Sequence, residues 1–103
     1  MNVKLKRLTI LSPRDLEDPV LETLLEMQPA LPGFTTLAVS GHGESFEGAR
    51  AQEQVRGRID RSMVWLVLPE EDVERTLTQL SRSMPHPDII WWVEPVDAMG
   101  KLA

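Results

Sequence analysis

The chain has no cysteine among its 103 residues. Disulfide bonds, thiolate zinc sites and a cysteine nucleophile are therefore excluded, and a reducing compartment is expected. Long apolar runs are also lacking, because no segment approaches the roughly 20 residues that a membrane span requires. The apolar stretch after the first basic residues is too short and too interrupted for a signal peptide. These absences predict a cytoplasmic protein with no membrane insertion.

The chain has fewer basic than acidic residues, 11 Lys and Arg against 16 Asp and Glu, so its formal net charge is −5. Nucleic-acid binding is not expected, because phosphate contact requires a basic face. Four of the cations nevertheless lie close together, at Arg50, Arg56, Arg58 and Arg61. Local positive charge on an acidic protein indicates a small anionic ligand.

Catalytic constellations are lacking as well. The serines have no His and Asp companions in a known order, and no pair of acids stands apart from those expected at helix starts. We therefore expect no enzymatic activity.

The chain has the size and the 42% hydrophobic content of one domain, residues 1–103. Residues 8–29 and 64–85 are two versions of one unit: strand, proline, acidic helix start, amphipathic helix, methionine and proline. Each unit is followed by a further strand, so the order is βαβ, loop, βαβ. Two right-handed βαβ units in one antiparallel sheet, with both helices on one face, form the α+β ferredoxin-like fold, βαββαβ.

The individual elements follow from local signals. Strands are expected at residues 5–13, 34–41, 62–69 and 88–96, and helices at about 15–28 and 70–84. Apolar residues recur at helical spacing in both helices: Leu16, Val20, Leu24 and Met27, then Val73, Leu77, Leu80 and Met84. Asp15 or Asp18 is expected to cap the first helix. Of the neighbours Trp91 and Trp92, one should face the helices and the other the open sheet face, where subunit packing best explains an exposed indole.

A long polar segment, residues 41–61, joins the second and third strands, and loops of this length in compact domains are usually functional. Gly41 and Gly43 let the chain turn out of the sheet, contact a ligand, or do both. His42 between them is an exposed turn residue, a small-molecule contact or a metal ligand. Arg56 and Arg58 either grip a phosphate or carboxylate together or form a solvated loop rim.

Metal binding has three candidate residues, His42, Glu44 and His86, whose imidazole and carboxylate groups suit zinc or copper. Their spacing is not that of a compact metal motif. We therefore expect no metal site within one chain, and a site shared between copies stays open.

The order of elements and several motifs resemble the PII signalling superfamily, and more closely the small PII-like proteins encoded beside heavy-metal (RND-type) efflux systems. LKRLTILSP before an acidic helix is similar to the first PII strand and helix. GFTTLAVSGHG is similar to the second strand with its closing G-x-G, and SMVWLVLPEEDVERTLTQL to the strand and helix after the PII T-loop. The resemblance covers most of the chain. CutA is a more distant match, since it lacks so long a loop.

The resemblance implies a homotrimer with ligand sites in the clefts between subunits, and an adenine nucleotide as the candidate ligand. The ligand-binding positions carried over are Thr35 on the second strand and Gly41, His42 and Gly43 at the base of the loop. Residues 41–61 would be the T-loop, which docks onto target proteins. PII proteins wrap phosphates with a glycine- and basic-rich B-loop, whereas this chain has SMPHPDII there, with no evident backbone nest. A ligand smaller or less charged than ATP is therefore favoured.

Three functions fit these observations. The first is a PII-like sensor that binds a small ligand and regulates a membrane transporter through its loop, with heavy-metal efflux implied by resemblance alone. The second is a CutA-like accessory protein that binds copper or zinc. The third is a PII-like regulator of inorganic-carbon uptake that responds to bicarbonate and an adenine nucleotide.

Overall fold

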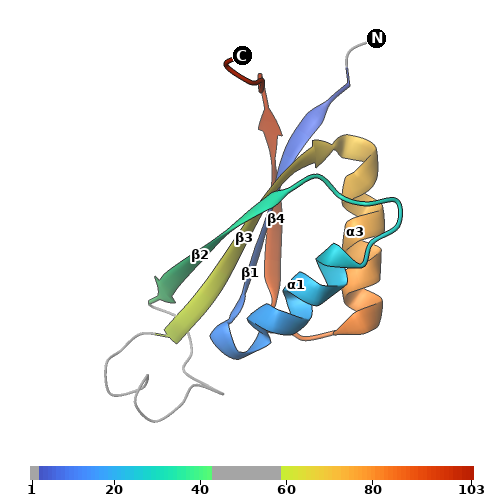
Figure 1. Cartoon of the computed structure of the whole chain (residues 1–103). Coiled ribbons are helices and arrows are strands. Elements are labelled where there is room, and N and C mark those ends of the chain that lie inside the picture. The colour runs from blue at the N-terminus through green and yellow to red at the C-terminus, as the bar shows by residue number, and fades with distance from the viewer. Residues whose placement is uncertain (1–2, 43–58) are drawn as a thin grey trace.

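The computed structural model describes residues 3–42 and 59–103. Its elements are β1 (Leu5–Pro13), the 3₁₀ turn η1 (Arg14–Leu16), α1 (Glu17–Leu25), β2 (Phe34–Gly41), β3 (Ile59–Pro69), α3 (Glu70–Ser83) and β4 (Ile90–Val96). The strands form one sheet in the order β2-β3-β1-β4, and every neighbouring pair is antiparallel. Both helices lie on the same face of the sheet (Figure 1). The predicted α+β ferredoxin-like fold is confirmed.

The first helix differs from the prediction at both ends. A 3₁₀ turn comes first, so α1 begins at Glu17 instead of residue 15, and neither Asp15 nor Asp18 caps it, because its N-cap is Leu16 with no side-chain hydrogen bond. The helix ends at Leu25 instead of residue 28. The turn after Leu25 is tightened, because the Met27 N–H donates to the Leu24 carbonyl three residues back at 3.4 Å.

The connection between β2 and β3 is shorter than predicted. Strand β3 begins at Ile59, inside the segment 41–61 that was expected to be loop, and Gly41 is still part of β2, paired with Ile59. The connection is therefore residues 42–58, of which residues 43–58 lie outside the described ranges.

The hydrophobic core lies between the sheet and the two helices. Its buried members are Leu8, Ile10, Val20, Leu24, Val64, Leu66, Leu68 and Leu80. The predicted face of α3 packs here, since Leu80 is buried and Val73, Leu77 and Met84 are partly buried against the cluster. Within the described ranges, no helix is both long enough and apolar enough to cross a bilayer.

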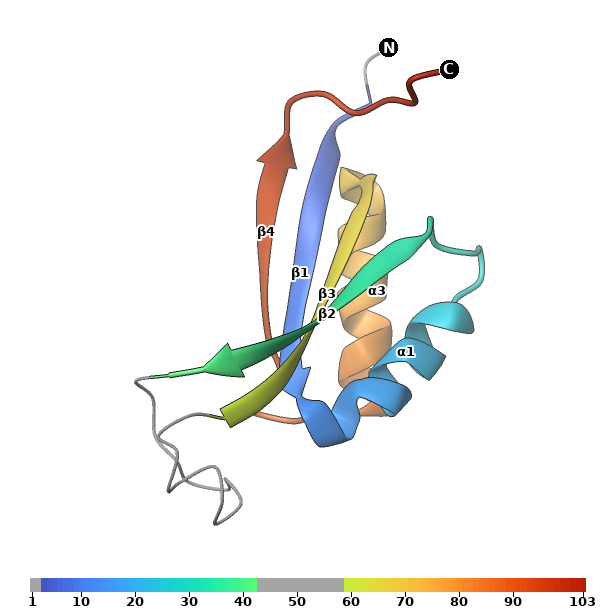
Figure 2. The ribbon, with the colours of Figure 1, turned by 60° about the vertical axis from the view of Figure 1, so that its left-hand side comes forward.

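The other face of the sheet is covered by neither of the described helices (Figure 2). Because Leu8 and Leu66 point into the core, the alternate positions on their strands point away from it. One cross-strand row of this open face consists of Thr35, Trp65, Thr9 and Trp92. The neighbouring row consists of Leu37, Met63, Leu11 and Ile90. The predicted division of the tryptophan pair is confirmed, because Trp92 lies on the open face and Trp91 on the helix side.

Candidate functional site

The ends of β2 and β3 form the base from which residues 43–58 depart. Gly41, the last residue of β2, lies against the side chain of Arg61, because a Cβ atom on Gly41 would stand 3.4 Å from Arg61 Nε. No left-handed backbone angle occurs at Gly41, so the role of glycine as a turn out of the sheet does not apply there. The space beside Gly41 is instead occupied by the Arg61 side chain, at a distance that a Cβ atom would meet as an ordinary contact.

Two further segments meet Arg61 at this point. Arg14, in the turn after β1, donates from Nε and Nη2 to the Arg61 carbonyl at 3.2 and 3.1 Å. Arg61 in turn donates from Nη1 to the Asp88 carbonyl at 3.5 Å, in the connection between α3 and β4. We call Arg14, Gly41, Arg61 and Asp88 the loop-base cluster.

The register of the sheet explains why Arg14 belongs to this cluster. Pro13 ends β1 opposite Arg61, and proline has no N–H with which to continue the ladder. The chain turns at once into η1, which leaves Arg14 beside the first residues of β3. Arg61 was part of the noted basic group, but sequence reasoning missed Arg14. The position of Arg14 directly after the strand-ending proline was the available signal.

The loop-base cluster is positively charged and accessible. Among the described residues, neither Arg14 nor Arg61 is paired with a carboxylate, because both guanidinium groups donate only to backbone carbonyls. Guanidinium groups bind phosphates and carboxylates through paired hydrogen bonds. The cluster can therefore hold a small anion. His42, also predicted as a ligand-binding residue, is exposed directly beside it.

The remaining predicted ligand residues have different positions. Thr35 is exposed near the start of β2, six residues before Gly41, which corresponds to about 20 Å along a strand. One chain alone therefore does not bring Thr35 and the loop-base cluster together. Gly43, Arg56 and Arg58 lie outside the described residues.

The metal candidates form no site among the described residues, where no group of three or more potential ligands is close enough to hold an ion. His86 is exposed, and its Nδ1 accepts a hydrogen bond from the backbone N–H of Asp88 at 3.1 Å. This bond shapes the turn that presents the Asp88 carbonyl to Arg61. Glu44 lies outside the described residues.

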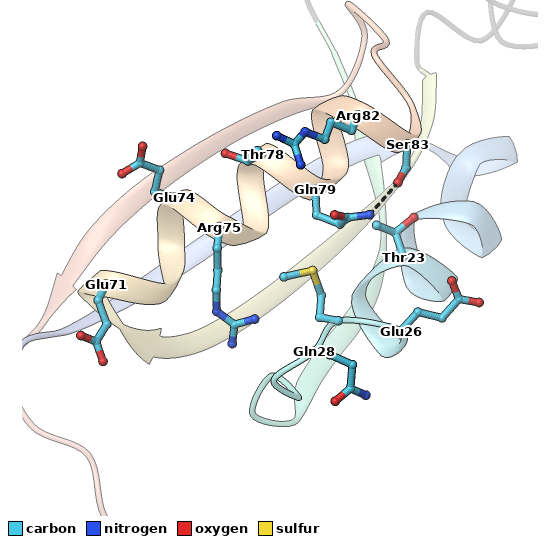
Figure 3. A pocket seen from close by; sticks show the side chains of 11 residues that line it. Thr23, Glu26, Gln28, Glu71, Glu74, Arg75, Thr78, Gln79, Arg82 and Ser83 are labelled. Atoms are coloured by element: carbon cyan, nitrogen blue, oxygen red, sulfur yellow. Dashed lines mark hydrogen bonds between the residues drawn. The ribbon is translucent and has the colours of Figure 1, made fainter.

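A separate hollow of about 610 Å³ lies between the end of α1 and the outer side of α3 (Figure 3). Its charged side chains are three acids and two arginines: Glu26, Glu71, Glu74, Arg75 and Arg82. Arg75 is already engaged, donating to the Asp72 carboxylate at 2.8 Å and to the Pro29 carbonyl at 2.9 Å. An anion would meet a net negative charge here, so the loop-base cluster is the better candidate site.

Comparison with known families gives one match over nearly the whole chain. The family model DUF3240, described as a protein of unknown function, matches residues 3–103. No curated protein matches the chain.

Solved structures share the fold at low sequence identity. A DUF3240 family protein from Shewanella baltica is 20% identical over 100% of both chains, with a TM-score of 0.77. A second structure is CPII, a nitrogen regulatory PII-like protein from Thiomonas intermedia bound to ADP, AMP and bicarbonate. It is 18% identical, the match covers 96% of this chain and 97% of CPII, and the TM-score is 0.69. A structure described as a PII-like signalling protein from Thermus thermophilus is 27% identical, covering 91% and 88%, with a TM-score of 0.63.

Proposed function

The chain belongs to the DUF3240 family, and we propose that it is a PII-like regulatory protein that binds an adenine nucleotide at its loop base. In this proposal the protein catalyses no reaction. Binding changes how residues 43–58 engage a partner protein, a membrane transporter, with heavy-metal efflux as the first system to test.

The loop-base cluster is the observation that carries this proposal. Arg14 donates to the main-chain carbonyl of Arg61, and the Arg61 side chain lies beside Gly41, at the point where residues 43–58 leave the sheet; neither guanidinium group has a carboxylate partner among the described residues. A phosphate held by Arg14 and Arg61 would therefore sit directly at the root of that segment. Support also comes from the fold, which the chain shares with CPII, a protein solved with ADP and AMP.

The neighbouring connection limits the size of the ligand. Residues 84–89 contain two prolines and no glycine, so they supply few of the backbone N–H groups that surround a triphosphate. The Asp88 carbonyl, an acceptor, is the group that this connection turns toward Arg61. A monophosphate or diphosphate, AMP or ADP, is therefore favoured over ATP.

A complete site requires a second copy of the chain. Thr35 lies about 20 Å along β2 from Gly41, so it can join the loop-base cluster only from a neighbouring subunit. The uncovered apolar sheet face supports such an assembly, because faces of this kind usually pack against another protein surface. We propose a homotrimer with the nucleotide in the clefts between its subunits.

Isothermal titration calorimetry of the purified protein with AMP, ADP, ATP and cyclic nucleotides tests the ligand. We expect binding of AMP or ADP, and Arg61→Gln should weaken it about tenfold or more, since a hydrogen bond to a charged group contributes about 1.5–3 kcal/mol. Arg82→Gln is the matched control, because Arg82 is an exposed arginine on α3 that lines two other hollows and makes no contact with the loop-base cluster among the hydrogen bonds described. Equal binding by both variants, or no nucleotide binding at all, would refute the proposal.

Bicarbonate is a second component to test, because CPII was solved with bicarbonate beside its nucleotides. If the protein regulates inorganic-carbon uptake, bicarbonate should raise its affinity for ADP or AMP in the same titrations. Copper and zinc are titrated in the same way. If the protein binds metal but no nucleotide, and His42→Ala abolishes the metal binding, the accessory metal-binding function is favoured instead.

A further inference from the structure

The connection between α3 and β4 contains a turn that one side chain, His86, holds in place. His86 stands between Pro85 and Pro87, and proline restricts both its own backbone and that of the residue before it. The His86 Nδ1 atom accepts a hydrogen bond from the Asp88 N–H at 3.1 Å, and the His86 carbonyl accepts one from the Ile89 N–H at 3.1 Å. The imidazole ring therefore fixes the orientation of Asp88 within the turn.

This orientation decides which group of Asp88 faces Arg61. The main-chain carbonyl of Asp88 accepts a hydrogen bond from Arg61 Nη1 at 3.5 Å. The carboxylate of the same residue is exposed, and it is absent from the ion pairs of the described ranges. Arg61 thus contacts the neutral oxygen of Asp88 and not the charged ones.

The carboxylate of Asp88 is nevertheless a close competitor for Arg61. The carbonyl and the side chain of one residue are attached to the same Cα atom, so a reorientation of the turn would bring the carboxylate to the guanidinium group. Hydrogen bonds between two charged groups are roughly twice as strong as those between neutral groups, and carboxylates pair with guanidinium groups in the same way as phosphates do. A carboxylate on Arg61 would therefore occupy the position that a bound anion needs.

We propose that His86 is a positioning residue for the loop-base cluster. Its bond to the Asp88 N–H keeps the Asp88 carboxylate away from Arg61, so that the guanidinium group stays available to an anion. The inference rests on the proposed function for the identity of that anion, AMP or ADP. The arrangement of His86, Asp88 and Arg61 itself can be measured without any ligand.

The chemistry of the bond supplies a matched pair of variants. Asparagine accepts a hydrogen bond from the backbone N–H two residues further on, which is the bond that His86 Nδ1 makes here. Leucine fills a similar space and has no acceptor. His86→Asn should therefore preserve the position of Asp88, whereas His86→Leu should release it.

Calorimetric titration with AMP and ADP tests the effect on binding. We expect His86→Leu to weaken the affinity about threefold, as for competition by one exposed ion pair, and His86→Asn to bind like the wild type. A loss caused only by a disturbed turn would be similar in both variants, so equal weakening by the two substitutions would overturn the proposal.

A second substitution identifies the competitor. In the His86→Leu protein, Asp88→Asn should restore the affinity, because the released turn then has no carboxylate to place on Arg61. Asp97→Asn in the same background is the matched control, since it removes one negative charge at an exposed position beyond β4. Recovery that is equal in the two double variants would show a general effect of net charge and would contradict the competition.

Nuclear magnetic resonance of the free protein tests the same arrangement without nucleotide. The Nε–Hε signal of Arg61, assigned by its disappearance in Arg61→Gln, should shift in His86→Leu and return to its original position when Asp88→Asn is added. An unchanged signal in His86→Leu, or a shift that persists in the double variant, refutes the positioning role. The expected shifts in a protein that binds neither AMP nor ADP would instead leave the role of His86 standing and refute the proposed function.

Discussion

An ion pair lies within the largely apolar open face of the sheet. The Arg7 guanidinium donates from Nη2 to Glu94 Oε1 at 2.8 Å, and its Cζ atom lies 5.0 Å from the centre of the Trp65 ring. Trp92 Nε1 donates to the same Glu94 oxygen at 3.1 Å. One carboxylate thus connects a cation and an indole on two neighbouring strands, which fixes the side chains on this part of the face.

The charge state of Glu94 makes the stability of the protein depend on pH. The hydrogen bond from Arg7 lowers the pKa of Glu94 below its ordinary value, with partial burial opposing the shift and the Trp92 bond and the Arg7 charge adding to it. A lowered folded-state pKa contributes stability above the unfolded-state pKa of about 4.3, and this contribution disappears as the pH falls through the folded-state pKa. Glu94→Gln should therefore reduce the free energy of unfolding more at pH 7 than at pH 2.5.

Urea unfolding at the two pH values, at one protein concentration, measures this difference. Asp97→Asn serves as the control for net charge, since Asp97 is exposed beyond β4. A Glu94→Gln penalty that is as large at pH 2.5 as at pH 7 would show that the glutamate acts through packing and not through its charge.

A Gly41 variant tests the structural role and the ligand-binding role of the loop base separately. A Cβ atom there would lie 3.4 Å from Arg61 Nε, 3.5 Å from Arg61 Cγ and 3.6 Å from the Ile59 carbonyl, which are ordinary contacts. Gly41→Ala should therefore fold with a stability within about 1 kcal/mol of the wild type. If Gly41 also contacts the nucleotide, the same variant should bind ADP or AMP more weakly.

Thermal unfolding and calorimetry of the same preparation check both parts of this prediction. Gly33→Ala is the control, because a Cβ atom on Gly33 would meet no described atom within 4 Å and the residue lies before β2. A large loss of stability in Gly41→Ala would contradict the packing argument, and unchanged nucleotide affinity would exclude Gly41 from the site.

Individual site residues could be predicted from sequence only where a local pattern marked them. The G-x-G after a strand indicated the loop base, and Gly41 and His42 do lie there. Arg14 could not be found by spacing, because its neighbour Arg61 is 47 residues away and the two meet only through the pairing of β1 with β3. Contacts of this kind depend on register, which is a property of the whole sheet.

At the scale of elements, the sequence predicted the strands and helices well and their ends less well. The spacing of apolar residues identifies a helix, but it does not show that Arg14–Leu16 form a 3₁₀ turn instead of the first turn of an α-helix. Strand β3 begins earlier than its apolar run because residues 59–61 pair with β2, and backbone pairing does not require apolar side chains.

The β2–β3 connection should be dispensable for folding. Replacement of residues 42–58 by Asn-Gly would join the paired ends Gly41 and Ile59 through a two-residue turn of the kind that hairpins favour. The shorter loop lowers the entropy cost of closure by about 1–2 kcal/mol, so the melting temperature should be unchanged or higher. Circular dichroism melting of the two proteins measures this.

The same replacement should abolish capture of the partner transporter in detergent extracts, because residues 43–58 are proposed to carry that contact. Melting that falls by many degrees would show that the connection supports the fold. Retained capture of the transporter would assign the contact to another surface.

At the scale of the whole molecule, the sequence predicted the fold from its own pattern, whereas it predicted the homotrimer only through resemblance. A repeated βαβ unit determines the layer order, since right-handed crossovers allow few alternatives. Oligomeric state depends instead on which faces stay uncovered. The uncovered face was identified only from the structure, in which the strand register places Trp92 and Ile90 on the open face.

The open face provides the sharpest test of the proposed homotrimer. Ile90 is 48% exposed at the first position of β4 and lies in the same cross-strand row as Leu11. Ile90→Asp should leave the single chain folded, because the side chain is already half in water, yet it would place a charge inside the packed interface. We expect dissociation into monomers at micromolar concentration in sedimentation velocity.

Leu25→Asp is the matched control, since Leu25 is 70% exposed on α1, on the opposite side of the sheet. A trimer that persists in Ile90→Asp but dissociates in Leu25→Asp would move the interface from the open face to the helices.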